Sequence, residues 1–318
     1  MTGIAGGLGC YLTRLFLQRG FDIAGNDIRS PEDACANGLA RVPYLWKATE
    51  CLTKADFDGV DIVINLSATG DRPMGLSSAQ FTVHNNTVPT VNLLEICKDL
   101  SLARFIQLGS GTSYLGVPAD QLPATELTMP RPTNAYSASK YSQDVLCLSY
   151  HYAYGIPVVV VRSGITYGAG RLAVAPHRFI INALRNEPIV VKGGDQTRTP
   201  THISEIAEYV AKVIEAPAQV CVGNVVNAVY PTNRQVKGEF SVMEMAQLVK
   251  EVTGSASPIE VVDYEPGERK GSGPLREWII STMADKIGMK PKIDFRTGVG
   301  LAAQWLREKM EAGRLTAW

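Results

Sequence analysis

Short apolar runs alternate with stretches of helical periodicity along the first half of the chain. The runs that predict strands are residues 21–27, 60–66, 105–108 and 157–162. The stretches that predict helices are residues 11–18, 88–99 and 137–154. Strands without a polar face, such as Val158 to Val161, are typical of a parallel sheet covered by helices on both faces. The pattern therefore predicts an α/β fold with a doubly wound parallel sheet.

The second half is more mixed and predicts a smaller α/β lobe. Residues 175–186, 204–215 and 241–253 have helical patterns, and Ser241 stands where a helix N-cap is expected. Residues 258–264 alternate like a strand, and residues 265–274 are rich in glycine, proline and charge, which predicts a loop.

A glycine-rich turn lies at the start of the chain. Gly3, Gly6 and Gly9 precede a predicted helix, whose N-terminal amides and dipole favour a pyrophosphate. Asp27 ends the next predicted strand, where a carboxylate accepts hydrogen bonds from a ribose, so NAD is favoured over NADP. Arg29 weakly favours NADP instead, because arginine can hold a 2′-phosphate. Only two residues precede Gly3, so we expect the chain to begin late, after most of the first strand.

Tyr136 and Lys140 lie four residues apart within a predicted helix, so both side chains face the same side. The ammonium can then stabilise the phenolate, and the tyrosine becomes usable as an acid or base near neutral pH. Ser110 directly follows a predicted strand, where its hydroxyl can bond a substrate oxygen whose charge changes. Arg198, in a Gly/Thr-rich segment, suits phosphate oxygens. His202, four residues later, is interpreted as structural.

Composition narrows the class of protein. The 318 residues contain 31 basic and 31 acidic side chains, so the net charge is zero and does not favour binding to nucleic acid or to an anionic membrane. No signal peptide and no apolar run of about 18 residues is present. Six cysteines without a CxxC spacing predict reduced core residues in a cytoplasmic protein, and four histidines without ligand spacing predict no metal.

With these motifs in place, the chain resembles the extended short-chain dehydrogenase/reductases, in particular the NAD-dependent sugar-nucleotide epimerase/dehydratase family. The resemblance covers nearly the whole chain. The segments that carry it are the glycine-rich turn 2–9, the strand 61–68, Asn86 with 92–95, the motif 136–140, the segment 162–168, the segment 285–291, and Trp305 in a closing helix.

The resemblance implies a Rossmann-type NAD-binding domain over residues 1–168, to which residues 199–230 return, and a substrate-binding lobe of residues 169–198 and 231–318. The residues that it implies for NAD binding are Gly3, Gly6, Gly9, Asp27, Leu66, Ser67, Ala68, Asn86, Tyr136 and Lys140. It implies catalysis by Tyr136, Lys140 and Ser110, and substrate contacts from Thr112, Arg198 and Arg269. It also implies a homodimer built on the helices around residues 88–99 and 137–154.

Two departures from the family pattern bear on the reaction. The family's 4,6-dehydratases carry an Asp-Glu pair after the active-site Ser/Thr, where this chain has Gly111, Thr112 and Ser113, so a dehydratase is disfavoured. The leading hypothesis is a nucleotide-sugar 4-epimerase. Ile165 replaces an asparagine that helps to position the substrate diphosphate, which favours a dehydrogenase/reductase of a sugar or another small alcohol or ketone as the alternative. A non-catalytic dinucleotide-binding protein is the third hypothesis.

Overall fold

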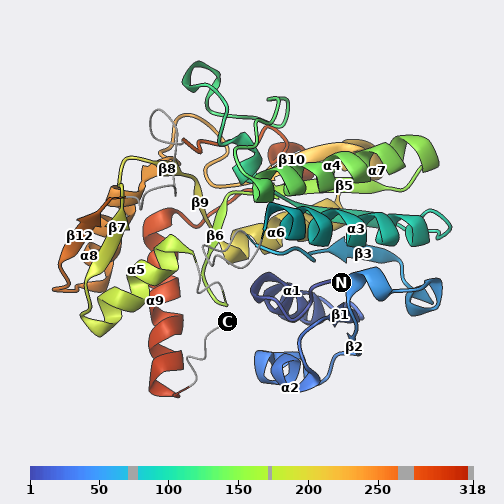
Figure 1. Cartoon of the computed structure of the whole chain (residues 1–318), viewed down its shortest axis with the longest axis horizontal. Helices are drawn as coiled ribbons and strands as arrows, with labels where there is room; N and C mark the ends of the chain where they lie inside the picture. The colour runs from blue at the N-terminus through green and yellow to red at the C-terminus, as the bar shows by residue number, and fades with distance from the viewer. Residues whose placement is uncertain (71–77, 171–173, 264–275, 314–318) are drawn as a thin grey trace.

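The computed structural model describes residues 1–70, 78–170, 174–263 and 276–313. Its centre is a parallel sheet of four strands (Figure 1). In spatial order these are β10 (Asn224–Ala228), β5 (Val158–Ser163), β4 (Arg104–Ser110) and β3 (Ile62–Asn65). A parallel pair, β1 (Gly25–Asp27) and β2 (Tyr44–Trp46), continues the sheet beyond β3. The predicted doubly wound α/β fold is confirmed.

Thr2 occupies the place of the central strand. It forms parallel bridges with Asn26 of β1 and with Asn65 of β3. The Thr2 amide donates to the Ile64 carbonyl at 3.0 Å, and the Asn26 amide donates to the Met1 carbonyl at 3.1 Å. The sheet is therefore continuous across a position where the sequence leaves almost no strand.

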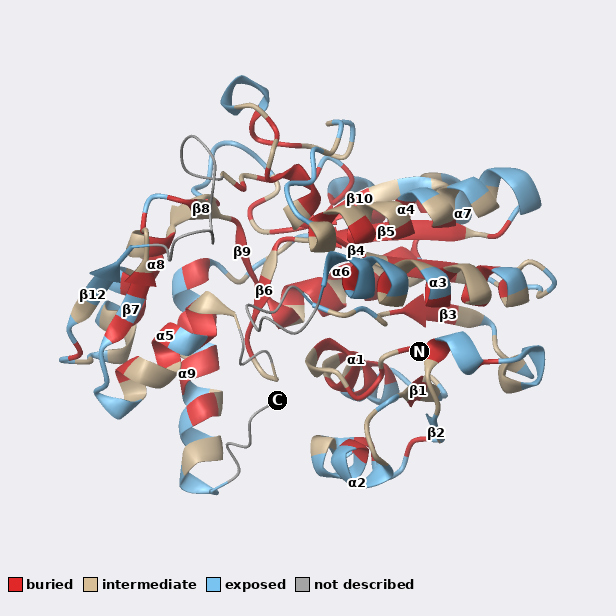
Figure 2. Ribbon diagram, viewed as in Figure 1, coloured by how far each residue is buried: buried red, intermediate tan, exposed pale blue. Residues whose placement is uncertain are grey.

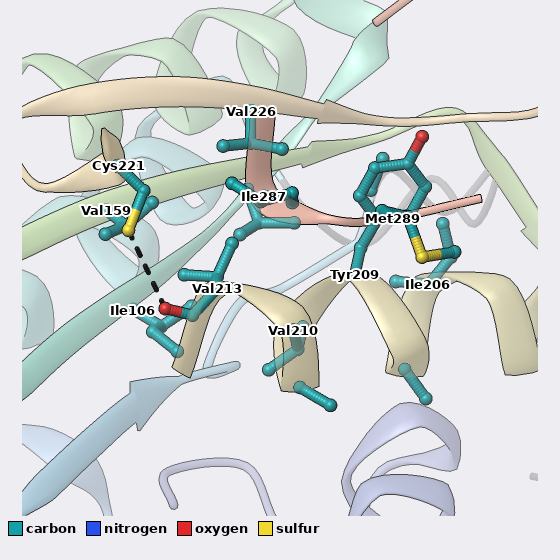
Figure 3. Close-up of a cluster of buried hydrophobic side chains, with 14 of the residues drawn as sticks. Ile106, Val159, Ile206, Tyr209, Val210, Val213, Cys221, Val226, Ile287 and Met289 are labelled. Atoms are coloured by element: carbon teal, nitrogen blue, oxygen red, sulfur yellow. Dashed lines mark hydrogen bonds between the residues drawn. The ribbon is translucent and has the colours of Figure 1, made fainter. Parts of the chain in front are cut away.

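Helices cover both faces of the sheet, as Figure 2 shows by the burial of the strands between them. One face carries α1 (Gly7–Gln18) and α6 (Ile203–Glu215), and the other carries α3 (Ala79–Cys97) and α4 (Ala135–Tyr154). Because successive side chains of a strand point to opposite faces, Val159 joins the α6 core and Val160 joins the α3–α4 core. Figure 3 shows the first of these cores, in which Val159 and Ile106 meet the α6 side chains.

A separate hydrophobic cluster holds the C-terminal part together, on the left in Figure 1. Its helices are α5 (Ala175–Arg185), α8 (Val242–Thr253) and α9 (Phe295–Glu311). Its parallel strands are β7 (Ile189–Lys192) and β12 (Ile259–Val262). Two further short strand pairs form: β6 (Ile165–Tyr167) with β9 (Pro200–His202), and β8 (Thr197–Arg198) with β11 (Phe240–Ser241). Two further short α-helices are α2 (Pro31–Ala34) and α7 (Ala218–Cys221).

The boundaries differ from the predicted ones where tertiary contacts or caps decide. Of the predicted strand 21–27 only β1 forms, and α3 begins nine residues before the predicted residue 88. That earlier start has a local cause, because the Ser78 hydroxyl caps the helix by accepting from the Phe81 amide at 3.1 Å. The Ser241 cap of α8 is confirmed. Residue 264 and the loop predicted over residues 265–274 lie outside the described residues.

The cysteine prediction is partly wrong. All six cysteines are free, but only four are buried, and Cys35 and Cys51 are exposed. Both exposed residues lie in short helical turns, Cys35–Leu39 and Thr49–Cys51, and not in a strand or long helix of the core. Among the described segments, no helix combines the length and the apolar character needed to cross a bilayer.

Candidate active site

The glycine-rich turn requires its glycines at two positions for different reasons. Gly3 has a φ of +63°, and a Cβ there would lie 3.1 Å from the Ser67 nitrogen. Gly9 lies inside α1, where a Cβ would collide with the Ile4 carbonyl and lie 2.7 Å from the Gly3 oxygen. This close approach brings the first turn of α1, with its amides free of intrahelical acceptors, directly onto the loop. The arrangement fits a pyrophosphate.

The Asp27 carboxylate is fastened to this loop. Its Oδ2 accepts from the Ala5 amide at 3.0 Å, and its Oδ1 accepts from the Arg29 amide at 3.2 Å. The Arg29 guanidinium donates back to the Ala5 carbonyl at 2.6 Å. Each carboxylate oxygen keeps a second lone pair that a ribose hydroxyl can use. Arg29 is thus engaged with the loop backbone, and Asp27 retains acceptor capacity at the loop, while its bond to a ribose stays a prediction.

Lys140 is buried on α4, with 3% of its surface exposed. Its Nζ donates to Gln143 Oε1 at 2.5 Å. The Gln143 amide nitrogen donates in turn to Thr90 Oγ1 at 2.7 Å and to the Asn86 carbonyl at 2.8 Å, both on α3. It also reaches the Ser67 carbonyl at 3.4 Å, in the loop after β3. This buried amide therefore connects Lys140 to the segment that packs against Gly3.

Asn86 forms a second bridge to the loop after β3. Its Oδ1 accepts from the Thr69 amide at 2.6 Å, and its Nδ2 donates to Ser139 Oγ at 2.8 Å on α4. Asn86 is fully buried. The loop that contains the predicted cofactor contacts Leu66, Ser67 and Ala68 is thereby fixed between the glycine-rich turn and the helix that carries Tyr136.

Burial of Lys140 has a consequence for stability that can be measured. Desolvation lowers the pKa of Lys140 from its ordinary 10.5 to about 8, partly offset by Asp144. Between those pH values the unfolded chain binds more protons than the folded chain, so the parent protein gains stability as pH rises. Lys140→Met lacks this titration. Its free energy of unfolding relative to the parent is expected to fall by up to about 3 kcal/mol across that window, measured by urea unfolding.

The control for this prediction is Lys98→Met. Lys98 lies at the end of α3, and its hydrogen bond to Glu95 raises its pKa. The difference in free energy of unfolding between Lys98→Met and the parent should therefore stay constant over the same pH range. A Lys140→Met difference that does not change with pH would contradict a weakened, buried ammonium.

The hydroxyls of Ser110 and Thr112 lie together where β4 ends. Their Oγ atoms are 2.9 Å apart, and Ser110 Oγ also accepts from the Thr112 amide at 3.3 Å. Ser110 is in register with Ser163 at the end of β5. One residue further along, a Cβ on Gly164 would lie 2.5 Å from the Thr199 carbonyl. Successive turns thus run side by side from Ser110 to the segment that contains Arg198.

Arg198 lies on β8, and Nη1 of its guanidinium donates to the Thr197 carbonyl at 2.7 Å. Next to it the carboxylate of Glu277, 1% exposed, accepts from the Thr199 amide at 3.2 Å. Burial raises the pKa of Glu277, and Arg198 opposes that rise. Arg269, the other predicted cation, lies outside the described residues.

His202 has the structural role that the sequence predicted. It is the N-cap of α6, its ring accepts from the Ser204 amide at 3.4 Å, and its Nδ1 lies 2.7 Å from the Ser204 hydroxyl. Burial lowers its pKa to about 4, so the ring is neutral at physiological pH.

Three buried side chains at the site were missed by sequence reasoning: Gln143, Asp144 and Glu277. The first two lie on the same helix as Lys140, three and four residues after it. The spacing rule that identified Tyr136 and Lys140 could therefore also have identified them. Glu277 is almost 80 residues away from its partner Thr199, and no local pattern marks it. Among the described residues, no three His, Cys, Asp or Glu side chains gather as a metal site would need.

The fold and these groups define a Rossmann-type protein with a glycine-rich turn at the start of α1 and a Tyr/Lys pair on α4. The sequence profile of the NAD dependent epimerase/dehydratase family matches residues 1–228. The chain therefore belongs to the NAD dependent epimerase/dehydratase family, and the resemblance is confirmed.

Three distant relatives match over nearly their whole length. A UDP-glucuronate 4-epimerase of Thermodesulfobacterium geofontis is 24% identical over 98% of this chain and 96% of its own. The UDP-glucuronic acid 4-epimerase of Bacillus cereus, solved with UDP-glucuronic acid and NAD, superposes with a TM-score of 0.83 at 24% identity, over 96% of this chain and 98% of that one. The UDP-glucose 4-epimerase of Thermotoga maritima, solved with UDP-glucose, gives a TM-score of 0.85 at 20% identity, over 97% and 98%.

Proposed function

We propose that this protein is an NAD-dependent 4-epimerase of a nucleotide sugar. The observation that carries the proposal is that α4, on which Lys140 is buried one turn after Tyr136, packs against the turn after β4 that carries the paired hydroxyls of Ser110 and Thr112. A buried lysine with its pKa lowered to about 8 and a tyrosine at this spacing suit proton transfer at a carbinol near neutral pH.

The residues present fit NAD. The turn at Gly3 and the crowded Gly9 leave room for a pyrophosphate at the head of α1, and Asp27 offers an acceptor where an adenosine ribose would lie. Leu66, Ser67, Ala68 and Asn86 would line its other side, and Tyr136 and Lys140 would reach its nicotinamide ribose. When bound, NAD supplies the hydride acceptor of the reaction and its reduced form supplies the hydride donor.

The chain's own residues would move the proton. The Tyr136 phenolate accepts the proton of the sugar 4-hydroxyl, and later returns it to the oxygen of the opposite epimer. The Lys140 ammonium stabilises the phenolate. Ser110 and Thr112 donate hydrogen bonds to the same sugar oxygen as its charge changes.

The turn after β4 favours epimerisation over elimination. Ser110 is followed by Gly111, Thr112 and Ser113, so the turn contains no carboxylate that could act as the acid or base in the loss of water. Relatives whose names identify them as 4-epimerases of UDP-glucuronate and UDP-glucose support the same reaction. Arg198 would hold the nucleotide diphosphate, within a substrate lobe made of residues 169–198 and 231–318.

The alternative is a net dehydrogenase or reductase of a sugar or another small alcohol or ketone. Ile165 supports it, because this side chain cannot offer the hydrogen bond of the asparagine that helps to hold a diphosphate. Ile165 pairs with Pro200, two residues after Arg198, so the loss falls at the place where the diphosphate is expected.

The test uses purified protein with UDP-glucuronate, UDP-glucose and UDP-N-acetylglucosamine, each deuterated at C4. An epimerase is expected to yield the 4-epimer with deuterium retained and without accumulation of NADH, and NAD is expected in the denatured protein by mass spectrometry. Steady formation of NADH would favour the dehydrogenase. Absence of both reactions, together with an empty cofactor site, would overturn the proposal.

We further propose a homodimer in the cytoplasm. Val83 and Val88 on α3 and Val145 on α4 are 39%, 44% and 48% exposed, and a shallow groove runs along α3 between Thr87 and Glu95. Two helices that present apolar side chains to solvent favour packing against a second copy. Six free cysteines support a reducing compartment.

Val88→Asp is expected to convert the dimer to a monomer, because two like charges would be buried at the centre of the helix contact. Sedimentation velocity at micromolar concentration measures the change. Val261→Asp, on the 56% exposed Val261 of β12, is the matched control and should remain a dimer. A parent protein that sediments as a monomer would rule the dimer out.

A further inference from the structure

A buried ion pair joins α4, the helix that carries Tyr136 and Lys140, to β5. Asp144 is fully buried and Arg162 is 4% exposed. Arg162 Nε donates to Asp144 Oδ2 at 2.8 Å. Removing two charges from water costs several kcal/mol each, so a buried pair is weak evidence for stability and can have a different role.

Asp144 lies on the same face of α4 as Lys140, because it follows Lys140 by one helical turn. Its second oxygen, Oδ1, is buried and accepts no hydrogen bond within the described part of the chain. This oxygen packs against Gly109, where an added Cβ would lie 2.8 Å from it. The carboxylate, one helical turn after Lys140, therefore packs against the residue that precedes Ser110.

Arg162 continues the connection to the turn after β4. Its Nη1 donates to the Tyr114 hydroxyl at 2.7 Å, and its guanidinium carbon lies 5.3 Å from the centre of the Tyr114 ring. Tyr114 ends the short helical turn Gly111–Tyr114 that contains Thr112, and Ser110 caps that turn. A chain of charged and polar contacts thus runs from α4 through β5 to the turn with the two hydroxyls.

Titratable and charged groups near Lys140 come from α4, from β5 and from the turn after β4. On α4 itself the groups are the Tyr136 phenol one turn before Lys140, Asp144 one turn after it, and the Cys147 thiol, whose pKa burial raises far above its ordinary value. β5 contributes Arg162, and the turn after β4 contributes Tyr114, whose pKa burial raises. α3 and the sheet contribute only neutral groups to the Lys140 network, namely Asn86, Thr90, Asn65 and Gln107. Asp144 is therefore the counter-charge nearest to Lys140.

We propose that Asp144 and Arg162 form a positioning pair for catalysis: Asp144 keeps the buried Lys140 charged, and Arg162 fixes the hydroxyl turn at Ser110 and Thr112 against the Tyr136 helix. The pair does not touch the substrate. It acts through Lys140 on one side and through Tyr114 on the other.

The primary test follows Lys140 itself and does not depend on the substrate. In protein labelled with ¹³C at lysine Cε, the Lys140 signal is assigned by its loss in Lys140→Met and titrated by NMR. The parent midpoint is expected near 8. Asp144→Asn is expected to lower that midpoint by about one pH unit or more, because the ammonium loses its counter-charge while Arg162 remains. A midpoint within about 0.3 unit of the parent would overturn the proposal.

Two further variants make the result independent of folding defects. Asp144→Leu combined with Arg162→Met replaces the pair by apolar groups of similar size, which is often neutral for stability, and it should still lower the Lys140 midpoint. Asp144→Glu keeps the charge, so its Lys140 midpoint should lie close to that of the parent. Glu205→Gln is the control: this buried carboxylate accepts from the Lys292 and Ile293 amides and lies outside the Lys140 network. It should lower the melting temperature and leave the Lys140 midpoint unchanged.

The kinetic consequence rests on the proposed function. In Asp144→Asn, kcat/KM is expected to fall at least about tenfold at pH 8, and the alkaline limb of its pH profile should move to lower pH. A structural role alone would lower activity by the same factor at every pH. If no epimerisation occurs in the parent protein but the NMR midpoint moves, the proposed function fails and the charge coupling stands. If epimerisation occurs and the midpoint is unmoved, the positioning pair fails.

Discussion

Tyr136→Phe is expected to reduce turnover by about 10²–10⁴-fold while the protein stays folded and retains NAD. The substitution removes one hydroxyl from the N-terminal turn of α4, where the Asn134 cap and not the tyrosine starts the helix. The proton of the sugar hydroxyl then has no acceptor beside Lys140. The loss should appear in kcat more than in KM, because the phenolate acts mainly in the transition state.

The measurement is steady-state epimerisation of a UDP-sugar, together with the amount of NAD released on denaturation. Tyr152→Phe is a matched control on the same helix, since Tyr152 is 78% exposed and lies more than four turns away. It should leave kcat unchanged. A Tyr136→Phe protein with full turnover would exclude Tyr136 as the acid/base. A variant without turnover that keeps its cellular function would instead favour the third hypothesis, a binding protein without catalysis.

Gly9→Ala is expected to abolish cofactor binding and to lower stability by roughly 1–3 kcal/mol. The added methyl group would collide with the Ile4 carbonyl and lie 2.7 Å from the Gly3 oxygen, and both are backbone atoms that no side-chain rotation can move. Helix α1 must therefore shift away from the turn. Its first-turn amides then no longer converge on the pyrophosphate, and Thr2, between β1 and β3, loses its support.

Absorbance and mass spectrometry of the denatured protein measure bound NAD, and thermal unfolding measures stability. Gly300→Ala is the matched control, because Gly300 also lies within a helix, α9, but has no neighbour within 4 Å of an added Cβ. That variant should keep its NAD and gain a few tenths of a kcal/mol or more from the better helix former. Stoichiometric NAD in Gly9→Ala would show that the close approach is not needed.

Local patterns were sufficient for much of the fold. The four valines of β5 predicted a strand buried on both faces, and they divide between the two cores as that prediction requires. The predicted helix 175–186 matches α5 (Ala175–Arg185) within one residue. The short strands β2 and β6–β11 were not predicted, because two to five residues carry no periodicity of their own and form strands only when a partner is already in place.

The candidate site divides in the same way. Tyr136 and Lys140 could be read from the sequence because a helix places residues four apart on one face. Asp144 shares that spacing, but its meaning depends on Arg162, which comes from a different element 18 residues further along the chain. The strand neighbour of Arg198 is Phe240, and it depends on the register between β8 and β11, which no single segment encodes.

The sequence by itself determined the α/β alternation, the glycine-rich turn, Asp27 and the Tyr136–Lys140 pair, because each depends on backbone sterics or helical spacing within about 20 residues. Only the tertiary structure decided that Thr2 completes the sheet, that Gln143 joins Lys140 to the loop after β3, and that Arg162 joins the Tyr136 helix to the turn at Ser110. These contacts join residues that are distant in the chain. Their formation depends on which faces the packed cores bring together, and a buried polar group must then find its partner there.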